Sequence, residues 1–136
     1  MAVAVLDHIN IVASDLARTI EFYERLLGLT RFDHPMFAGP EPTGAWLCDG
    51  TGHPVIHVQK YDPAQHDRHS PVPADTTGSI DHVAFRCEDY EAMRAHVDAL
   101  GEAYQTFDFP PANIRQIRLT DPDNVLLELN FPLHRA

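Results

Sequence analysis

The 136-residue chain has the length of one domain, and its composition, 44% hydrophobic and 22% charged residues, is typical of a folded globular protein. Its 10 Lys and Arg residues against 20 Asp and Glu give a net charge of −10, which repels phosphate backbones and argues against a nucleic-acid partner. The opening lacks the basic segment of an export signal, no apolar run spans a bilayer, and two cysteines are too few for a disulfide framework, so we expect a cytoplasmic protein without a membrane partner.

The first predicted element is a strand around residues 5–12, in which apolar residues alternate with polar ones such as His8. Asp15 then stands at a capping position, and an amphipathic helix runs from there to Gly28. This helix is expected to bury a stripe of apolar side chains: Leu16, Ile20, Tyr23 and Leu27. Further strands of this first copy are predicted at residues 44–48 and 55–58.

The same order of elements recurs in the second half of the chain, which indicates an internal repeat. A strand begins at His82, a second Asp-His pair, and a helix runs from Asp89 to Gly101. That helix is expected to bury Tyr90, Met93, Val97 and Leu100. Further strands are predicted at residues 114–119 and 125–129, and the Pro-, Asp-, His- and Thr-rich residues 61–79 link the two copies. Each copy therefore contains a strand, a helix and about three more strands.

Strand alternation leaves metal-ligand side chains on the sheet faces that the helices do not cover. The first copy contributes His8 and His57, and the second contributes His82 and Glu128, with His57 and Glu128 at equivalent positions of the repeat. Imidazole and carboxylate groups suit Fe, Mn, Co, Ni or Zn, and an unpaired carboxylate among aliphatic residues is costly to bury. The pattern predicts one divalent metal ion as the cofactor.

Candidate pocket residues accompany these ligands. Trp46 is predicted either to line a substrate pocket or to fill the core. Arg86 shares the ligand-bearing face and could bind a carboxylate of the substrate or form a salt bridge with a nearby acidic residue. Arg115 and Arg118 lie on opposite faces of their strand, so at most one can enter the pocket, and Arg115 is taken as the candidate.

Two segments of the sequence, LDHINIVASDLARTIEFYERLLGL near the start and IRLTDPDNVLLELNF near the end, resemble the opening and closing signatures of the vicinal oxygen chelate superfamily. This group includes glyoxalases, methylmalonyl-CoA epimerases, fosfomycin-resistance enzymes and extradiol dioxygenases. The resemblance implies an α+β, glyoxalase-like fold of two paired βαβββ modules that form a half-open barrel around a metal site, commonly in a homodimer. It implies a single domain over residues 1–136, with module one at about 1–60, the linker at about 61–79 and module two at about 80–136.

By the same resemblance, His8, His82 and Glu128 are metal ligands, whereas His57 falls where relatives carry Glu, Gln or another group. His57 is expected to be either a fourth ligand or a catalytic base, and Glu128 is included among the catalytic residues. Three imidazoles and one carboxylate around a divalent ion leave a charge of about +1, which favours an anionic oxygen.

The expected function is that of a metal-dependent lyase or isomerase, which chelates a small-molecule substrate through adjacent oxygens and stabilises an enolate-like intermediate. The alternatives are an Fe(II) extradiol-type dioxygenase and a non-catalytic small-molecule binding or resistance protein. Metal identity and oxygen uptake would separate the two enzymatic readings.

Overall fold

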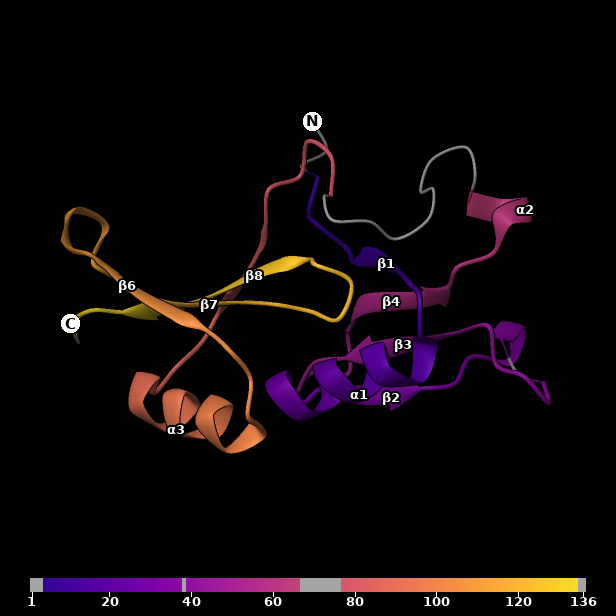
Figure 1. Cartoon of the computed structure of the whole chain (residues 1–136), viewed down its shortest axis with the longest axis horizontal. Helices are drawn as coiled ribbons and strands as arrows, with labels where there is room; N and C mark the ends of the chain where they lie inside the picture. Colours follow the sequence, from indigo (N-terminus) through magenta and orange to yellow (C-terminus); the bar gives the residue numbers. More distant parts are fainter. Residues whose placement is uncertain (1–3, 38, 67–76, 135–136) are drawn as a thin grey trace. The chain divides into compact units, whose positions relative to one another are not determined.

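Two four-stranded sheets, each accompanied by one long helix, make up the computed structural model, which describes residues 4–37, 39–66 and 77–134 (Figure 1). The chain divides into two units, Met1–Pro73 and Ala74–Ala136. The middle of the predicted linker, residues 67–76, lies outside the described residues.

The first unit has the sheet order β1-β4-β3-β2, in which β1 pairs with β4 in parallel and the other pairs are antiparallel. The long helix α1 lies against β3 and β4. The elements of this unit are β1 (Ile9–Ala13), α1 (Leu16–Leu27), β2 (Thr30–Phe32), the 3-10 turn η1 (Pro35–Phe37), β3 (Gly44–Cys48), β4 (Pro54–Lys60) and the short helix α2 (Pro63–His66).

The second unit repeats this topology, with the order β5-β8-β7-β6 and a parallel β5–β8 pair beside antiparallel pairs. Its elements are β5 (Val83–Arg86), α3 (Tyr90–Leu100), β6 (Gln105–Phe109), the 3-10 turn η2 (Pro110–Ala112), β7 (Ile114–Thr120) and β8 (Leu126–Pro132). The predicted α+β fold with two βαβββ modules is thereby confirmed.

The helix ends lie where the sequence places them. Asp15 accepts a hydrogen bond from the backbone N–H of Arg18 (3.0 Å) at the start of α1, and Asp89 accepts one from Ala92 (3.1 Å) at the start of α3. Both helices end at a glycine in the left-handed region, where a side chain would be strained.

The two units differ in how deeply the helix is buried. Helix α1 buries Thr19, Ile20, Phe22, Tyr23 and Leu26. Of its predicted stripe, Ile20 and Tyr23 are buried, whereas Leu16 and Leu27 are half-buried. Helix α3 turns its predicted stripe toward the sheet, but only Val97 is fully buried, whereas Tyr90, Met93 and Leu100 are half-buried. The first unit therefore has the larger hydrophobic core.

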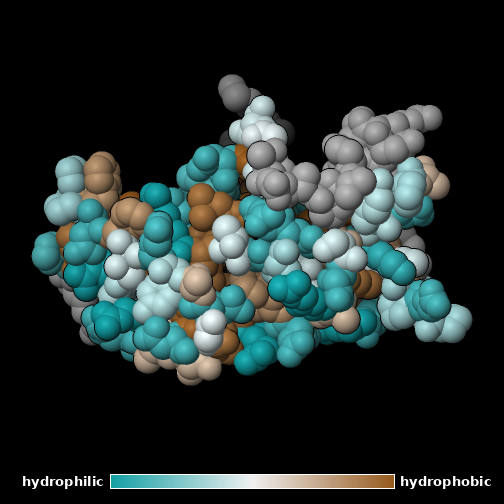
Figure 2. All heavy atoms as spheres, viewed as in Figure 1, coloured by the Kyte–Doolittle hydropathy of each residue, from teal (hydrophilic) through white to brown (hydrophobic). Residues whose placement is uncertain are grey.

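Hydrophilic residues cover much of the face shown in Figure 2, with hydrophobic residues among them. Within the described ranges, no helix combines the length and apolarity needed to cross a membrane. Among the residues that the structure describes, the large hydrophobic side chains that remain exposed are Val5, Leu6, Phe32, Ile80, Phe107 and Phe109.

Candidate metal centre

Each unit carries two of the four predicted ligands on one face of its sheet. In the first unit His57 lies on β4, opposite Asn10 of β1, and His8 precedes Asn10 by two residues. In the second unit Glu128 lies on β8, opposite Ala84 of β5, and His82 stands in the corresponding position. His8 and His82 immediately precede β1 and β5, and continuing the strand alternation places His8 on the face of His57 and His82 on the face of Glu128.

In the first unit the two histidines lie in an aromatic group. Their ring centroids are 6.3 Å apart. Trp46, the residue opposite His57 on β3, stacks on the His57 ring at 4.3 Å and meets the His8 ring edge-on at 4.8 Å. The Phe37 ring lies 4.9 Å from that of His57. The predicted pocket residue Trp46 is thus in contact with both ligand candidates.

Gly44 allows this packing. A Cβ atom at Gly44 would lie 2.8 Å from the carbonyl oxygen of Val58 and 3.5 Å from the Phe37 ring. Only a residue without a side chain lets β3 approach β4 this closely while Phe37 packs over the strand.

His57 carries an unused nitrogen. Its side chain is buried, and within the described part of the chain its Nε2 atom has no hydrogen-bond partner. Burial lowers the pKa of His57 below its usual value, and the nearby charge of His8 lowers it further. The ring is therefore neutral near pH 7, and its nitrogen suits a metal ion or a proton in transfer.

In the second unit Glu128 is the centre of a polar network. Its side chain is only 7% exposed. Gln116 donates from Nε2 to Oε1 (3.0 Å), Arg118 forms an ion pair with Oε2 (3.0 Å), and His82 Nε2 lies 3.3 Å from Oε1. The buried carboxylate is thus compensated, as a buried charge must be.

Two aspartates orient the leading histidines. His8 Nδ1 lies 2.6 Å from the carboxylate of Asp7, and His82 Nδ1 lies 2.7 Å from that of Asp81. Hydrogen bonding to His8 lowers the pKa of Asp7. A carboxylate only accepts, so Nδ1 carries the hydrogen and the Nε2 lone pair of a neutral ring remains available as a ligand. The repeated Asp-His pair was visible in the sequence, but its role was missed.

The tautomer of His82 bears on whether the second unit can bind a metal ion. With the hydrogen on Nδ1, the Nε2 atom of His82 has a lone pair, and it lies 3.3 Å from Glu128 Oε1, which is also an acceptor. Such a pair requires a cation between them, either a proton on Nε2 or a metal ion bound to both atoms. Two ligand atoms at zinc-like bond lengths in near-tetrahedral geometry lie about 3.2–3.5 Å apart. The observed separation therefore fits a shared ion.

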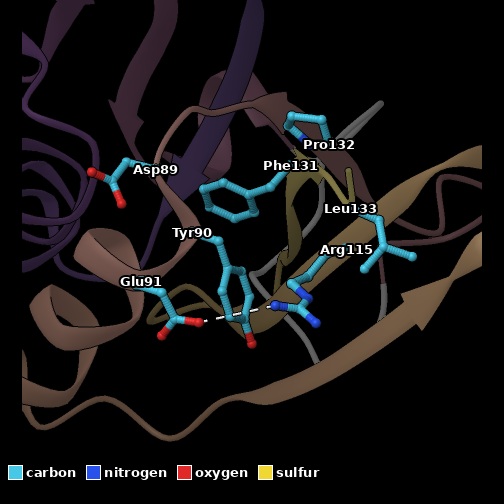
Figure 3. Close-up of a pocket in the computed structure, with 7 residues that line it drawn as sticks. All are labelled: Asp89, Tyr90, Glu91, Arg115, Phe131, Pro132 and Leu133. Carbon is cyan, nitrogen blue, oxygen red and sulfur yellow. Dashed lines mark ion pairs between the residues drawn. The ribbon is translucent and has the colours of Figure 1, made fainter. Parts of the chain in front are cut away.

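The predicted pocket arginines are placed differently from one another. Arg86 lies on the ligand-bearing face, opposite Asn130, and is exposed without an ion pair to any described residue. Arg115 lies on the other face, toward α3, where it forms hydrogen bonds with Asp108 (2.8 and 3.0 Å) and lowers the pKa of that carboxyl. Figure 3 shows Arg115 beside Tyr90 and Glu91 in a pocket on this face.

The arginine of β7 that contacts Glu128 is therefore Arg118, whereas the predicted pocket residue Arg115 lies on the opposite face of that strand. Strand alternation places Arg115 and Arg118 on opposite faces, but it does not say which of them lies on the face of Glu128. That depends on the register of β7 with β8, where Arg118 stands opposite Glu128.

Neither unit assembles a complete metal site from its described residues, since no group of three or more His, Cys, Asp or Glu side chains is close enough to hold an ion. Each unit carries two candidate ligands, whereas metal sites in enzymes commonly use three or more protein ligands.

Comparison with known proteins identifies the fold and the family. Several solved structures are similar to the chain over nearly its whole length. One is a glyoxalase/bleomycin resistance protein/dioxygenase domain from Frankia sp. EAN1pec, with 19% identity, a TM-score of 0.71, and 96% of this chain and 99% of that chain covered. Another, from the mobile metagenome of V. Pseudocholerae, has 21% identity, a TM-score of 0.66 and 96% of both chains covered.

A third is a mutant of the genomically encoded fosfomycin resistance protein FosX from Listeria monocytogenes, in complex with Mn(II) and a dihydroxypropylphosphonic acid. It has 17% identity and a TM-score of 0.69, with 96% of this chain and 93% of that chain covered. No curated protein matches the sequence. The sequence model of one family matches residues 5–129. The chain belongs to the Glyoxalase/Bleomycin resistance protein/Dioxygenase superfamily.

Proposed function

We propose that this protein is a metal-dependent enzyme of lyase or isomerase type, which binds a small substrate through adjacent oxygens and stabilises an enolate-like intermediate. The observation that carries the proposal is the closeness of His82 Nε2 and Glu128 Oε1, 3.3 Å apart, with Asp81 fixing the tautomer of His82. The unused Nε2 atom of His57 supports it from the other unit.

The proposed ligands are His8 and His57 from one unit and His82 and Glu128 from the other. We further propose that the two modules and their linker act as one glyoxalase-like domain.

When bound, a divalent metal ion would supply Lewis-acid stabilisation of a developing oxyanion. The chain's own residues provide the rest. Asp7 and Asp81 hold the leading histidines in the ligand tautomer. Trp46 and Phe37 keep water from one side of the His57 ring. His57 acts at Nε2 either as the fourth ligand or as the base that accepts a substrate proton, which its lowered pKa permits at neutral pH.

The experiment is elemental analysis of protein purified without added metal, run beside a screen of thiohemiacetals, acyl-CoA esters and catechols. Mn²⁺ is the first metal to add, because the FosX relative was crystallised with Mn(II). Isomerisation or addition that is lost with chelator and restored by metal supports the proposal. Oxygen uptake with Fe(II) and a catechol would support a dioxygenase instead, and binding without turnover or metal would support a sequestering protein.

We also propose a C2 homodimer. The edge strands β2 and β6 are exposed along their whole length, and open sheet edges tend to pair with another chain. Sedimentation that shows only a 15.3 kDa species at micromolar concentration would count against the dimer.

A further inference from the structure

Arg118 is bound to the carboxylate that the proposed metal would use. Its Nη2 atom lies 3.0 Å from Glu128 Oε2. The same guanidinium donates from Nε (3.1 Å) and Nη2 (2.8 Å) to Gln116 Oε1, while Gln116 donates to the other oxygen of Glu128. The guanidinium and the amide together hold both oxygens of a buried side chain.

Loss of a proton cannot release the guanidinium from the Glu128 carboxylate, because arginine side chains stay charged throughout the pH range in which proteins are stable. Its Cζ atom also lies 4.5 Å from the centre of the Phe107 ring, which is a cation–π contact. The side chain is 37% exposed, so part of it is in contact with solvent.

The equivalent position of the first unit has a neutral residue. Arg118 stands opposite Glu128 between β7 and β8, as Trp46 stands opposite His57 between β3 and β4. Of the two matching positions, Glu128 therefore has a permanent positive charge beside it, whereas His57 has a neutral ring.

We propose that Arg118 is a resident counter-ion, which neutralises Glu128 in the metal-free protein and which an incoming divalent ion must displace. This inference rests on the proposed metal site. A metal ion on Glu128 would place a second, larger positive charge beside the guanidinium, and like charges at this range in a partly buried site repel strongly. Arg118 therefore weakens metal binding and keeps the metal-free protein folded.

The test is titration of the chelator-treated, full-length protein with Mn²⁺ by calorimetry at constant ionic strength. Arg118→Met keeps the length and the contact with Phe107 but removes the charge, and we expect it to bind Mn²⁺ at least about tenfold more tightly than the native protein. The matched control is Arg115→Met, from the same strand but the opposite face, which changes the net charge equally and should leave the affinity unchanged.

Arg118→Lys separates charge from shape, because it keeps a cation near Glu128 and should bind Mn²⁺ with nearly native affinity. The melting temperature gives a second readout, in which metal-free Arg118→Met melts lower than the native protein and gains more from saturating Mn²⁺. If Arg118→Met does not fold, Arg118→Gln replaces it, with the same tighter binding expected.

Different results would contradict the proposed metal site and the proposed role of Arg118. A native protein that binds no Mn²⁺ or other divalent ion overturns the metal site and this inference with it. A native protein that binds Mn²⁺ while Arg118→Met binds equally or more weakly overturns only the resident counter-ion. Equal tightening in Arg118→Met and Arg115→Met would assign the effect to overall charge and would overturn it as well.

Discussion

The two units share one topology, yet they surround equivalent ligand positions with opposite chemistry. In the first unit His57 is buried among Trp46 and Phe37, with a nitrogen that no described residue uses. In the second unit Glu128 is engaged by three polar groups, including an arginine. A neutral imidazole can be buried by aromatic rings alone, whereas a carboxylate requires compensating charge. The repeat thus places His57 and Glu128 at matching positions, while the charge of each side chain determines which residues surround it.

The largest difference should appear when the anionic ligand is removed. Glu128→Gln keeps the shape and the hydrogen bonds available to an amide but removes the only proposed anionic ligand. We expect Mn²⁺ affinity to fall more than about hundredfold, in calorimetric titration. His57→Ala should lower affinity comparably if His57 is a ligand and much less if it is a base. Stoichiometric metal in Glu128→Gln would contradict the ligand assignment.

The aromatic group should matter most for the stability of the first unit. Trp46→Ala removes the stack on His57 and the edge contact with His8, and we expect the free energy of unfolding to fall by about 2–3 kcal/mol, from urea denaturation. Trp46→Phe, which keeps a ring, should lose less. Phe107→Ala removes a more exposed ring in the second unit. If it lowers the free energy of unfolding as much as Trp46→Ala does, the expected difference between the two units is contradicted.

The Asp-His pairs are the feature that both units share, so their removal should have similar effects. Asp7→Asn and Asp81→Asn leave an amide that can donate to Nδ1 and so favour the wrong tautomer for binding at Nε2. Each should weaken Mn²⁺ binding by about tenfold or more without a large change in melting temperature. An effect in only one of the two variants would show that the pairs do not have the same role.

The smallest expected effect is a change in how the free energy of unfolding depends on pH. Because the folded-state pKa of His57 is lowered from 6.5, the unfolded chain takes up its proton first as the pH falls. His57 therefore contributes stability that is present above pH 6.5 and is lost as the pH falls through the folded-state pKa. In chelator-treated protein, urea unfolding at about pH 7.5 and 5.5 should show a free energy of unfolding that depends less on pH in His57→Gln than in the native protein. Parallel curves would contradict the burial of a neutral ring.

Much of the fold follows from local patterns. Asp15 and Asp89 begin helices, and Gly28 and Gly101 end them, because capping and left-handed geometry depend on a few neighbouring residues. The repeat and the strand alternation also placed His57 and Glu128 at matching positions. What local patterns missed were the choice of Leu26 over Leu27 and the roles of Asp7 and Asp81.

The sequence by itself determined the two long helices, most of the strands and the faces on which candidate ligands lie, since these depend on the periods of helices and strands, but it did not locate β2 or β6. Only the tertiary structure decided which side chains meet across strands. It placed Arg118 rather than Arg115 on Glu128 and Trp46 on His57, because cross-strand neighbours depend on pairing register, which no single strand encodes.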